Sequence, residues 1–308
     1  MTEAEEAALS RVLRRLKDDD YAFVMPTPRT HALVAGRLGS ARRGNLRDIF
    51  GWGRPFQEDA LDPALLADLR TGGVVEAKDD RLRLTIAVSS AEGRLHLHSR
   101  PGSGQDAVFF GPDSYRFLRV VDEALRDGLS VSRALDIGTG AGVGALAIAA
   151  RRPHAQVIGA DVNPLALRFT ALNARHAGLA VRTVAGVGLG ADDGLYDLII
   201  ANPPYIADSK GFTYRDGGGL FGAERPVEWA REGLDRLALG GRLALYTGSP
   251  VVNGRDIVLD ELRRLIRPGF EMTYAELDPD VFGGSLGRPE YAEVERIAAV
   301  GAIIERAR

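Results

Sequence analysis

Four glycines at every second position follow a short apolar run in the middle of this chain. The run is residues 134–137, and the glycines are Gly138, Gly140, Gly142 and Gly144. Because glycine has no side chain, backbone N–H groups of such a loop can approach a ligand closely, and the N-terminus of a following helix adds further donors. The stretch therefore predicts a buried strand, a ligand-binding loop and a helix.

The choice of ligand depends on an acidic residue inside the strand. The spacing Gly140-x-Gly142-x-x-Ala145 also fits the dinucleotide-binding pattern in its permissive form, and Asp161 lies near the position of a ribose-binding acid. However, the carboxylate of Asp136 would be costly to bury beside a pyrophosphate, whereas it suits a cationic ligand with an ammonium group. S-adenosylmethionine is such a ligand.

In three places the chain resembles the class I S-adenosylmethionine-dependent methyltransferases. The residues that carry the resemblance are Asp-Ile-Gly-Thr-Gly-Ala-Gly at 136–142, Ala-Asp-Val-Asn-Pro at 160–164 and Asn-Pro-Pro-Tyr at 202–205. Each motif alone is a weak signal, but the three in this order are specific. The resemblance implies an α/β fold with a Rossmann-like seven-stranded sheet, and S-adenosylmethionine as the cofactor.

The resemblance also implies a set of cofactor contacts. In the family, the acid after the second strand accepts hydrogen bonds from the ribose hydroxyls, which suits Asp161 because an ionised carboxylate offers only acceptors; a helix N-cap is the alternative. An acid after the third strand commonly holds the adenine amino group, but Val187 stands there, so Asp192, Asp193 or a backbone carbonyl would replace it.

A segment before the first strand folds over the bound cofactor in related enzymes. Phe110, Pro112 and Asp113 lie at the matching distance. The plainer interpretation is that Asp113 or Ser114 caps a helix that runs to Leu125. The expected cofactor-binding residues are Phe110, Pro112, Asp136, Gly138, Thr139, Gly140, Gly142, Asp161, Val162, Asn163 and Asn202.

The motif Asn202-Pro203-Pro204-Tyr205 is the expected catalytic centre. An amide or aromatic amine nitrogen is a poor nucleophile because its lone pair is delocalised. Two acceptors aimed at the NH2 group, the Asn202 side-chain oxygen and the Pro203 carbonyl, can draw that lone pair out of conjugation. The two prolines hold the backbone in place, and Tyr205 can stack on the planar group. A rigid turn after a strand is the alternative.

Strands and helices alternate after residue 108, which predicts a parallel sheet covered on both faces. We expect strands at 134–137, 157–160, 181–186, 196–201, 242–246 and 272–277 and within 292–304, with the last two as an antiparallel hairpin. Helices are expected at 144–151, 164–177, 228–239 and 257–266. Residues 208–222 and 249–253 are expected to be exposed loops near the reacting edge.

The N-terminal third, residues 1–107, is expected to be a smaller α+β domain for substrate recognition or docking, and residues 108–308 the catalytic domain. A helix is expected from Thr2 toward residue 18, with Ala7, Leu9, Val12, Leu13 and Leu16 on one face. A second helix at 63–69 precedes a hairpin of strands 74–77 and 82–88. Helix then hairpin is typical of a winged helix, and also of many small docking modules.

Two features of this third have both a plain and a functional interpretation. Residues 42–56 interleave arginines with aromatic residues, which could bind RNA, but the nearly neutral overall charge favours a surface helix with a hydrophobic anchor. His96 and His98 alternate on one expected strand as two metal ligands would, yet without a third ligand they are ordinary strand residues. We expect no metal.

Composition excludes several classes of protein. With 39 Lys and Arg against 42 Asp and Glu, the net charge of −3 gives no overall attraction to nucleic acid. The absence of cysteine excludes disulfides, thiolate zinc sites and cysteine nucleophiles. The acidic N-terminus and the absence of a long apolar run favour a cytoplasmic protein without a membrane partner.

The methyl acceptor stays open at the level of the sequence. Asn-Pro-Pro-Tyr motifs occur in methyltransferases of protein glutamine, of adenine N6 and of guanine N2 in RNA, so the resemblance favours a protein glutamine or an RNA base as the acceptor. A small molecule is the alternative. A non-catalytic cofactor sensor with a nucleic-acid-binding hairpin is disfavoured by the intact motif. A nicotinamide dehydrogenase is disfavoured because no proton-relay residue is evident.

Overall fold

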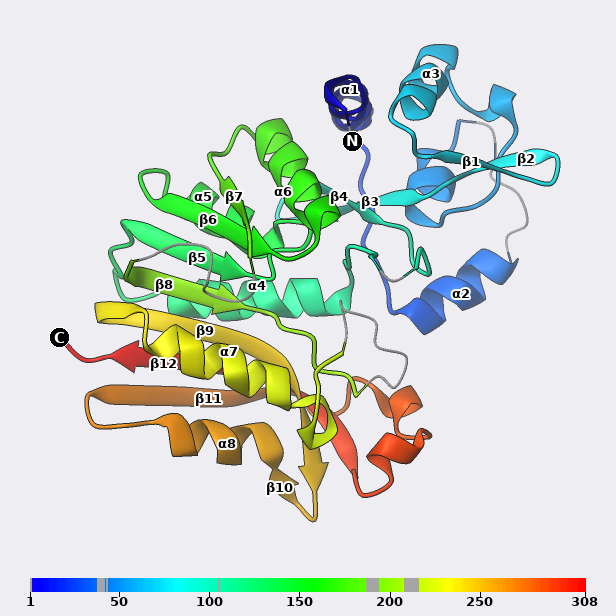
Figure 1. The fold of residues 1–308 in the computed structure, drawn as a ribbon. Helices are drawn as coiled ribbons and strands as arrows, with labels where there is room; N and C mark the ends of the chain where they lie inside the picture. The colour runs from blue at the N-terminus through cyan, green and yellow to red at the C-terminus, as the bar shows by residue number, and fades with distance from the viewer. Residues whose placement is uncertain (1, 38–41, 43, 105, 187–193, 208–215) are drawn as a thin grey trace.

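The computed structural model describes residues 2–37, 42, 44–104, 106–186, 194–207 and 216–308. Its largest element is a sheet in which the strands pair in the order β11-β12-β9-β8-β5-β6-β7, with β10 added to β9. This is the expected seven-stranded sheet. Helices cover both of its faces, and the N-terminal third packs against one side of the sandwich (Figure 1).

The parallel half of the sheet follows the predicted alternation closely. Its elements are β5 (Arg133–Ile137), α5 (Val143–Arg151), β6 (Gln156–Asp161), α6 (Pro164–Ala177), β7 (Arg182–Ala185) and β8 (Tyr196–Ala201). Helix α6 begins where the Asn163 side chain accepts a hydrogen bond from the N–H of Leu165, and it ends at Gly178 with a φ of 69°. Local capping signals therefore set both ends of this helix.

The antiparallel half differs from the prediction in one strand. Its elements are α7 (Glu224–Leu234), β9 (Leu237–Val252), β10 (Arg255–Asp256), α8 (Ile257–Leu265), β11 (Phe270–Asp278) and β12 (Arg296–Arg306). The expected exposed loop at 249–253 is wrong, because residues 249–252 lie within β9, where Ser249 is fully buried. The helix expected at 228–239 already ends at Leu234, and β9 begins at Leu237 with an irregularity at Gly240, whose φ is 74°. Strand β9 pairs with β8 and β12, and β12 extends the pairing as far as Val251.

Two layers of buried side chains enclose the sheet. Helices α5, α6 and α4 (Pro112–Ala124) share one cluster with the N-terminal third, and α7 and α8 share a second cluster on the opposite face. Strands such as β8 are buried on both faces, as expected of a parallel sheet between helices. The sheet therefore holds its carboxyl-end loops on a rigid base.

The described residues of the N-terminal third form three α-helices and two hairpins. They are α1 (Glu3–Asp18), α2 (Pro28–Arg37), α3 (Pro63–Thr71), the pair β1 (Val75–Lys78) and β2 (Arg81–Leu84), and the pair β3 (Ile86–Ala91) and β4 (Arg94–Ser99). Helix α1 starts with the predicted capping box between Thr2 and Glu5, although Ala8 rather than Ala7 completes its buried face. The expected strand 82–88 is split, because residues from Ile86 onward pair with β4 instead of β1.

Short helical turns fill several connections. They are Arg47–Gly51, Glu58–Ala60, Leu220–Gly222, Gly283–Ser285 and Pro289–Tyr291. The arginines and aromatic residues of 42–56 are partly structural, since Phe50 and Phe56 are fully buried and Arg54 forms a buried ion pair with Asp48 at 2.7 Å. The hydrophobic-anchor interpretation fits these contacts better than an open RNA-binding surface.

Candidate active site

The sheet brings the three motifs together at one edge. In the sheet register Ile137 of β5 lies opposite Ala160 of β6 and Ala201 of β8. The next residue of each strand is Gly138, Asp161 or Asn202, so the three strand ends are adjacent. Between β5 and β8 the strand order reverses, and ligands of open α/β sheets bind at such a switch point.

The glycine loop takes a backbone path that other residues would resist. Gly138, Gly140 and Gly142 have φ values of 67°, 56° and 77°. A Cβ on Gly138 would lie 2.7 Å from the indole of Trp229 on α7, so this position also needs glycine for space. The loop thus passes close to its neighbours and leads directly into the N-terminus of α5.

Asp136 is turned toward its own loop. The side chain is 1% exposed, and its Oδ2 accepts hydrogen bonds from the Thr139 hydroxyl at 2.8 Å and from the Ala145 N–H at 2.9 Å. Burial raises the pKa of Asp136 to about 7 despite these two bonds. The structure therefore shows Asp136 as the group that orders the loop and the start of α5, and contact with a ligand ammonium stays a prediction.

Asp161 connects the glycine loop to the start of α6. Its Oδ2 accepts from the Gly140 N–H at 3.0 Å and its Oδ1 accepts from the Asn163 N–H at 2.9 Å. Burial raises the pKa of this carboxyl, while the backbone hydrogen bonds oppose that rise. Each carboxylate oxygen has a second lone pair, so the group can also accept from a ligand. Val162 beside it is 48% exposed at the same edge.

Both polar atoms of the Asn163 side chain form hydrogen bonds within the protein. Its side-chain oxygen caps α6, and its Nδ2 donates to the carbonyl of Asp106 at 2.8 Å. The second bond ties the segment that precedes α4 to the cofactor edge of the sheet. The expected contact between Asn163 and the cofactor stays a prediction.

The side chain of Asn202 is the polar group of the motif that is available to a ligand. It is half-buried, and within the described part of the chain its side-chain amide takes part in no hydrogen bond. Pro203 is buried and Pro204 half-buried, and both have trans peptide bonds. A half-buried amide at a strand end is thus open to a ligand, next to a rigid turn.

Tyr205 has partners other than those the sequence predicted. The expected stacking on a planar substrate requires an open ring face, but the side chain is only 8% exposed. Its ring makes edge contacts with Phe282 at 5.5 Å and with Tyr246 at 6.5 Å between ring centroids. A Cβ on Gly248 would lie 2.4 Å from the ring. The ring therefore serves packing in this structure.

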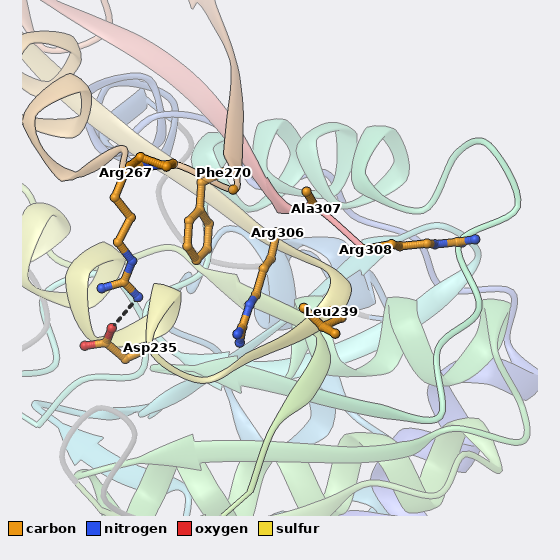
Figure 2. A pocket seen from close by; sticks show the side chains of 9 residues that line it. Asp235, Leu239, Arg267, Phe270, Arg306, Ala307 and Arg308 are labelled. Atoms are coloured by element: carbon orange, nitrogen blue, oxygen red, sulfur yellow. Dashed lines mark hydrogen bonds and ion pairs between the residues drawn. The ribbon is translucent and has the colours of Figure 1, made fainter.

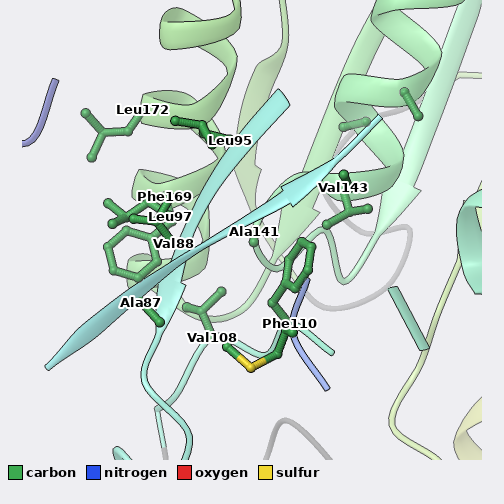
Figure 3. Close-up of a cluster of buried hydrophobic side chains, with 14 of the residues drawn as sticks. Ala87, Val88, Leu95, Leu97, Val108, Phe110, Ala141, Val143, Phe169 and Leu172 are labelled. Atoms are coloured by element: carbon green, nitrogen blue, oxygen red, sulfur yellow. The ribbon is translucent and has the colours of Figure 1, made fainter. Parts of the chain in front are cut away.

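The expected lid residues lie at the start of α4, where Phe110 and Asp113 are buried and Pro112 is half-buried. Phe110 stacks on His98 with ring centroids 4.9 Å apart, and it shares a cluster with Ala141 and Val143 of the glycine loop and α5 (Figure 3). Pro112 is the first residue of α4. The predicted caps Asp113 and Ser114 are wrong, because Gly111 is the N-cap and Asp113 lies inside the first turn.

The histidine pair is part of the same packing. His96 and His98 are both buried, and His98 Nε2 lies 2.8 Å from the Ser89 hydroxyl. Burial lowers the pKa of His96 to about 4 and that of His98 to about 3, so both rings are neutral. In the described ranges, no group of three His, Asp or Glu side chains is placed to hold a metal ion.

Some predicted site positions fall on residues that the structure does not describe. Asp192 and Asp193, proposed for the adenine contact, lie outside the described residues, as do Val187, which stands at the position of the family's acid, and the segment 208–215 of the expected substrate loop. The remainder of that loop returns to the motif, since the Gly217 N–H donates to the Ile206 carbonyl at 2.9 Å.

Several residues at this edge had no recognised signal in the sequence. Trp229 contacts the glycine loop, and Tyr246 contacts Asp113. Asn173 donates to the Ala141 carbonyl at 2.9 Å. The apolar run at 243–246 predicted a strand that contains Tyr246, but only the packed sheet shows that Asp113 is the partner of Tyr246.

A surface groove lies at a distance from the candidate active site. It is lined by residues around Asp235, Leu239, Arg267 and Phe270, and Arg267 pairs with Asp235 at 2.7 Å (Figure 2). Because β9 and β11 both begin there, the groove lies at the opposite end of these strands from Asn202. None of the predicted site residues lines it.

Comparisons with known proteins relate this chain to methyltransferases. A family model for the methyltransferase small domain matches residues 117–215. The release factor glutamine methyltransferase of Rhodospirillum rubrum is 39% identical over 221 residues, which is 66% of this chain and 67% of that protein. Ribosomal RNA small subunit methyltransferase C of Pseudomonas entomophila is 30% identical over 182 residues, 56% of this chain and 53% of that protein.

A solved structure supports the fold alone. Trm5b of Pyrococcus abyssi superposes with a TM-score of 0.51 at 14% identity, covering 76% of this chain and 62% of that one. Among the helices that the structure describes, none is both long and apolar enough to cross a membrane.

Proposed function

This chain belongs to the class I S-adenosylmethionine-dependent methyltransferases, and on that premise we propose that it methylates the side-chain amide of a glutamine in a protein. The observation that carries the proposal is Asn202, a half-buried amide without a hydrogen-bond partner in the described structure, beside the glycine loop. The enzyme is a methyltransferase and S-adenosylmethionine is its cofactor.

The residues at the carboxyl edge of β5 and β6 fit this cofactor. The loop 138–142 has little side-chain bulk, and Asp161 has free lone pairs beside it. We assign the cofactor's binding to this loop, with Asp161 on the ribose hydroxyls and Val162 as an apolar contact. Phe110, Pro112, Asp136, Thr139, Asn163 and Asn202 remain proposed contacts. The cofactor supplies an electrophilic methyl group on a sulfonium.

The role of Asn202 and Pro203 is to prepare the acceptor nitrogen. An amide NH2 offers two N–H donors, and the Asn202 side-chain oxygen together with the Pro203 carbonyl offers two acceptors. When both bonds form, the nitrogen lone pair is drawn out of conjugation and can be aimed at the methyl group. The nitrogen becomes acidic as it is methylated, so it can lose a proton to water without a special base.

Rigidity of the motif supports this role. Pro203 and Pro204 restrict the backbone, and the buried Tyr205 anchors the next residue. The two acceptors are therefore held before the substrate arrives, which reduces the entropy lost on reaching the reactive geometry.

A glutamine is favoured as the acceptor because of the similarity to the Rhodospirillum enzyme, which covers two thirds of both chains. An RNA base is the second candidate, supported by the similarity to the Pseudomonas enzyme. Both carry a planar NH2 group, so the same pair of acceptors serves either one.

Residues 1–107 are proposed to dock the acceptor, with residues 108–308 as the catalytic part. One buried cluster runs from Leu9 on α1 to Ile200 on β8, so the two parts share a core. Docking of a macromolecule on the N-terminal part would thus be connected to the cofactor edge through packed side chains.

Transfer of a radiolabelled methyl group tests the proposal. The purified chain is incubated with labelled S-adenosylmethionine and, separately, with an unmethylated bacterial release factor or with small-subunit ribosomal RNA. Label on a release-factor glutamine, located by mass spectrometry, supports the proposal. Label on the RNA alone would show that an RNA base, and not a glutamine, is the acceptor. Label on neither would refute both acceptors.

A further inference from the structure

A buried carboxyl group lies behind the catalytic motif. Asp113, in the first turn of α4, is 5% exposed. Its Oδ1 accepts a hydrogen bond of 2.6 Å from the hydroxyl of Tyr246 on β9, and Arg116 lies 3.4 Å from the same oxygen. Tyr246 also meets the ring of Tyr205 edge-on, with 6.5 Å between ring centroids, and the Asp113 carboxyl is one of the groups that raise the pKa of Tyr205. This carboxyl thus joins α4 to β9 next to the motif residue Tyr205.

An apolar residue would be the cheaper choice at this position. Burial of a carboxylate costs several kcal/mol unless it is paired and hydrogen-bonded. Here burial raises the pKa of Asp113, and its contacts with Tyr246 and Arg116 oppose that rise. Burial and the nearby carboxyl also raise the pKa of Tyr205 and Tyr246, so both hydroxyls stay protonated, and that of Tyr246 donates to Asp113.

Tyr205 is held firmly by its surroundings as well. Its ring packs on the backbone at Gly248 and against the edge of Phe282. Two residues further on, the N–H of Ala207 donates to the hydroxyl of Tyr291 at 2.7 Å. The motif backbone is thus fixed on the side away from the cofactor, and the Tyr246 ring, held by the carboxyl of Asp113, packs against the Tyr205 side chain.

We propose that Asp113 is a positioning residue for methyl transfer, which acts through Tyr205 to set the Pro203 carbonyl and the Asn202 side chain. It does not touch the substrate. The proposal rests on the function proposed for Asn202 and Pro203, and it assigns a second function to the start of α4 in addition to any closure over the cofactor.

Substitutions test this role by comparing their effect on kcat with their effect on the affinity for S-adenosylmethionine. In D113A the Tyr246 hydroxyl loses its acceptor and the packing beside Tyr205 loosens, so we expect kcat to fall about 10- to 100-fold, the size expected when reacting groups are slightly displaced. The affinity for S-adenosylmethionine, measured by calorimetry, should change less than about threefold. D113N keeps one acceptor oxygen and should recover part of kcat.

Tyr21 provides a matched control. Its hydroxyl is also buried and donates to the Val88 carbonyl at 2.8 Å, in the N-terminal third. Y246F and Y21F each remove one buried phenol hydrogen bond, but only Y246F should lower kcat. Equal kcat for Y246F, D113A and wild type would overturn the proposal, as would a fall in kcat of the same size in Y21F.

A second measurement is independent of the acceptor. The ring of Tyr205 can be observed by NMR with 13C-labelled tyrosine, with its resonance assigned by its loss in Y205F. We expect this resonance to shift in D113N and not in Y21F. An unchanged resonance would overturn the inference even where wild type is active. A shifted resonance with no methyl transfer by the wild type would instead refute only the proposed acceptor.

Discussion

The two halves of the active edge are built in different ways. The cofactor half, at the ends of β5 and β6, consists mainly of backbone, and its carboxylates Asp136 and Asp161 bond to their own loops. The acceptor half, at the end of β8, presents the Asn202 side chain without a partner in the described chain. On the proposed function, cofactor binding depends on the shape of the loop, and methyl transfer depends on one side chain held by a rigid turn.

The strongest way to test this contrast is N202A. Loss of one of two acceptors for the transferred nitrogen should lower kcat by about 10²- to 10³-fold, the size seen when an aligned transition-state hydrogen bond is removed. Cofactor affinity should remain within about threefold of wild type. Calorimetry and radiolabel transfer measure the two effects. A comparable loss of cofactor affinity would contradict the division between the halves.

D161A should affect the other half. It removes the proposed ribose acceptor together with two bonds to the Gly140 and Asn163 N–H groups. Hydrogen bonds to charged groups contribute about 1.5–3 kcal/mol each, so we expect cofactor affinity to fall about 10- to 100-fold. Calorimetric titration measures it, with D216N, an acid of the acceptor side, as the control. Unchanged affinity in D161A would exclude the ribose assignment.

G138A tests the shape of the loop. The added Cβ meets the Trp229 indole at a residue with a φ of 67°, so stability should fall by about 1–2 kcal/mol and cofactor affinity by about tenfold. In G138A/W229A the clash with the indole should be relieved, while the backbone strain at residue 138 remains. Denaturant unfolding measures the stability of both variants and calorimetry measures their cofactor affinity. Identical losses of stability and affinity in the two variants would show that Trp229 does not matter.

D136N should have the smallest effect, a change in how stability depends on pH. Because the folded pKa of Asp136 is raised to about 7 from an ordinary value of about 4, the native state binds this proton more tightly. Wild-type stability therefore falls as the pH rises from about 4 to 7. D136N lacks this loss, so the melting temperature of D136N relative to wild type should rise by a few degrees between pH 5 and pH 8.

Thermal unfolding of both proteins at the two pH values decides the matter. A difference that does not depend on pH would mean that Asp136 is not the buried acid that the structure indicates. It would also mean that the cofactor half is less desolvated than the burial of Asp136 indicates.

Local signals in the sequence predicted much of the fold. Helix α6 and strand β8 have the predicted bounds, because a capping asparagine, a terminal glycine and an unbroken apolar run act within a few residues. The order of motifs along the chain also predicted that Gly138, Asp161 and Asn202 would meet at one edge, since parallel strands end on the same side.

Only the tertiary structure decided what these residues contact. The length of β9 depends on pairing with β12, which lies more than 40 residues later. The partners of Asp113 and Tyr205 come from α4, β9 and the region of Phe282, which are distant in the sequence. Sequence periodicity identifies a buried face but not the side chain opposite it, because that depends on how complete elements pack. The chain by itself therefore determined the cofactor loop and the motif, and packing determined what holds them in place.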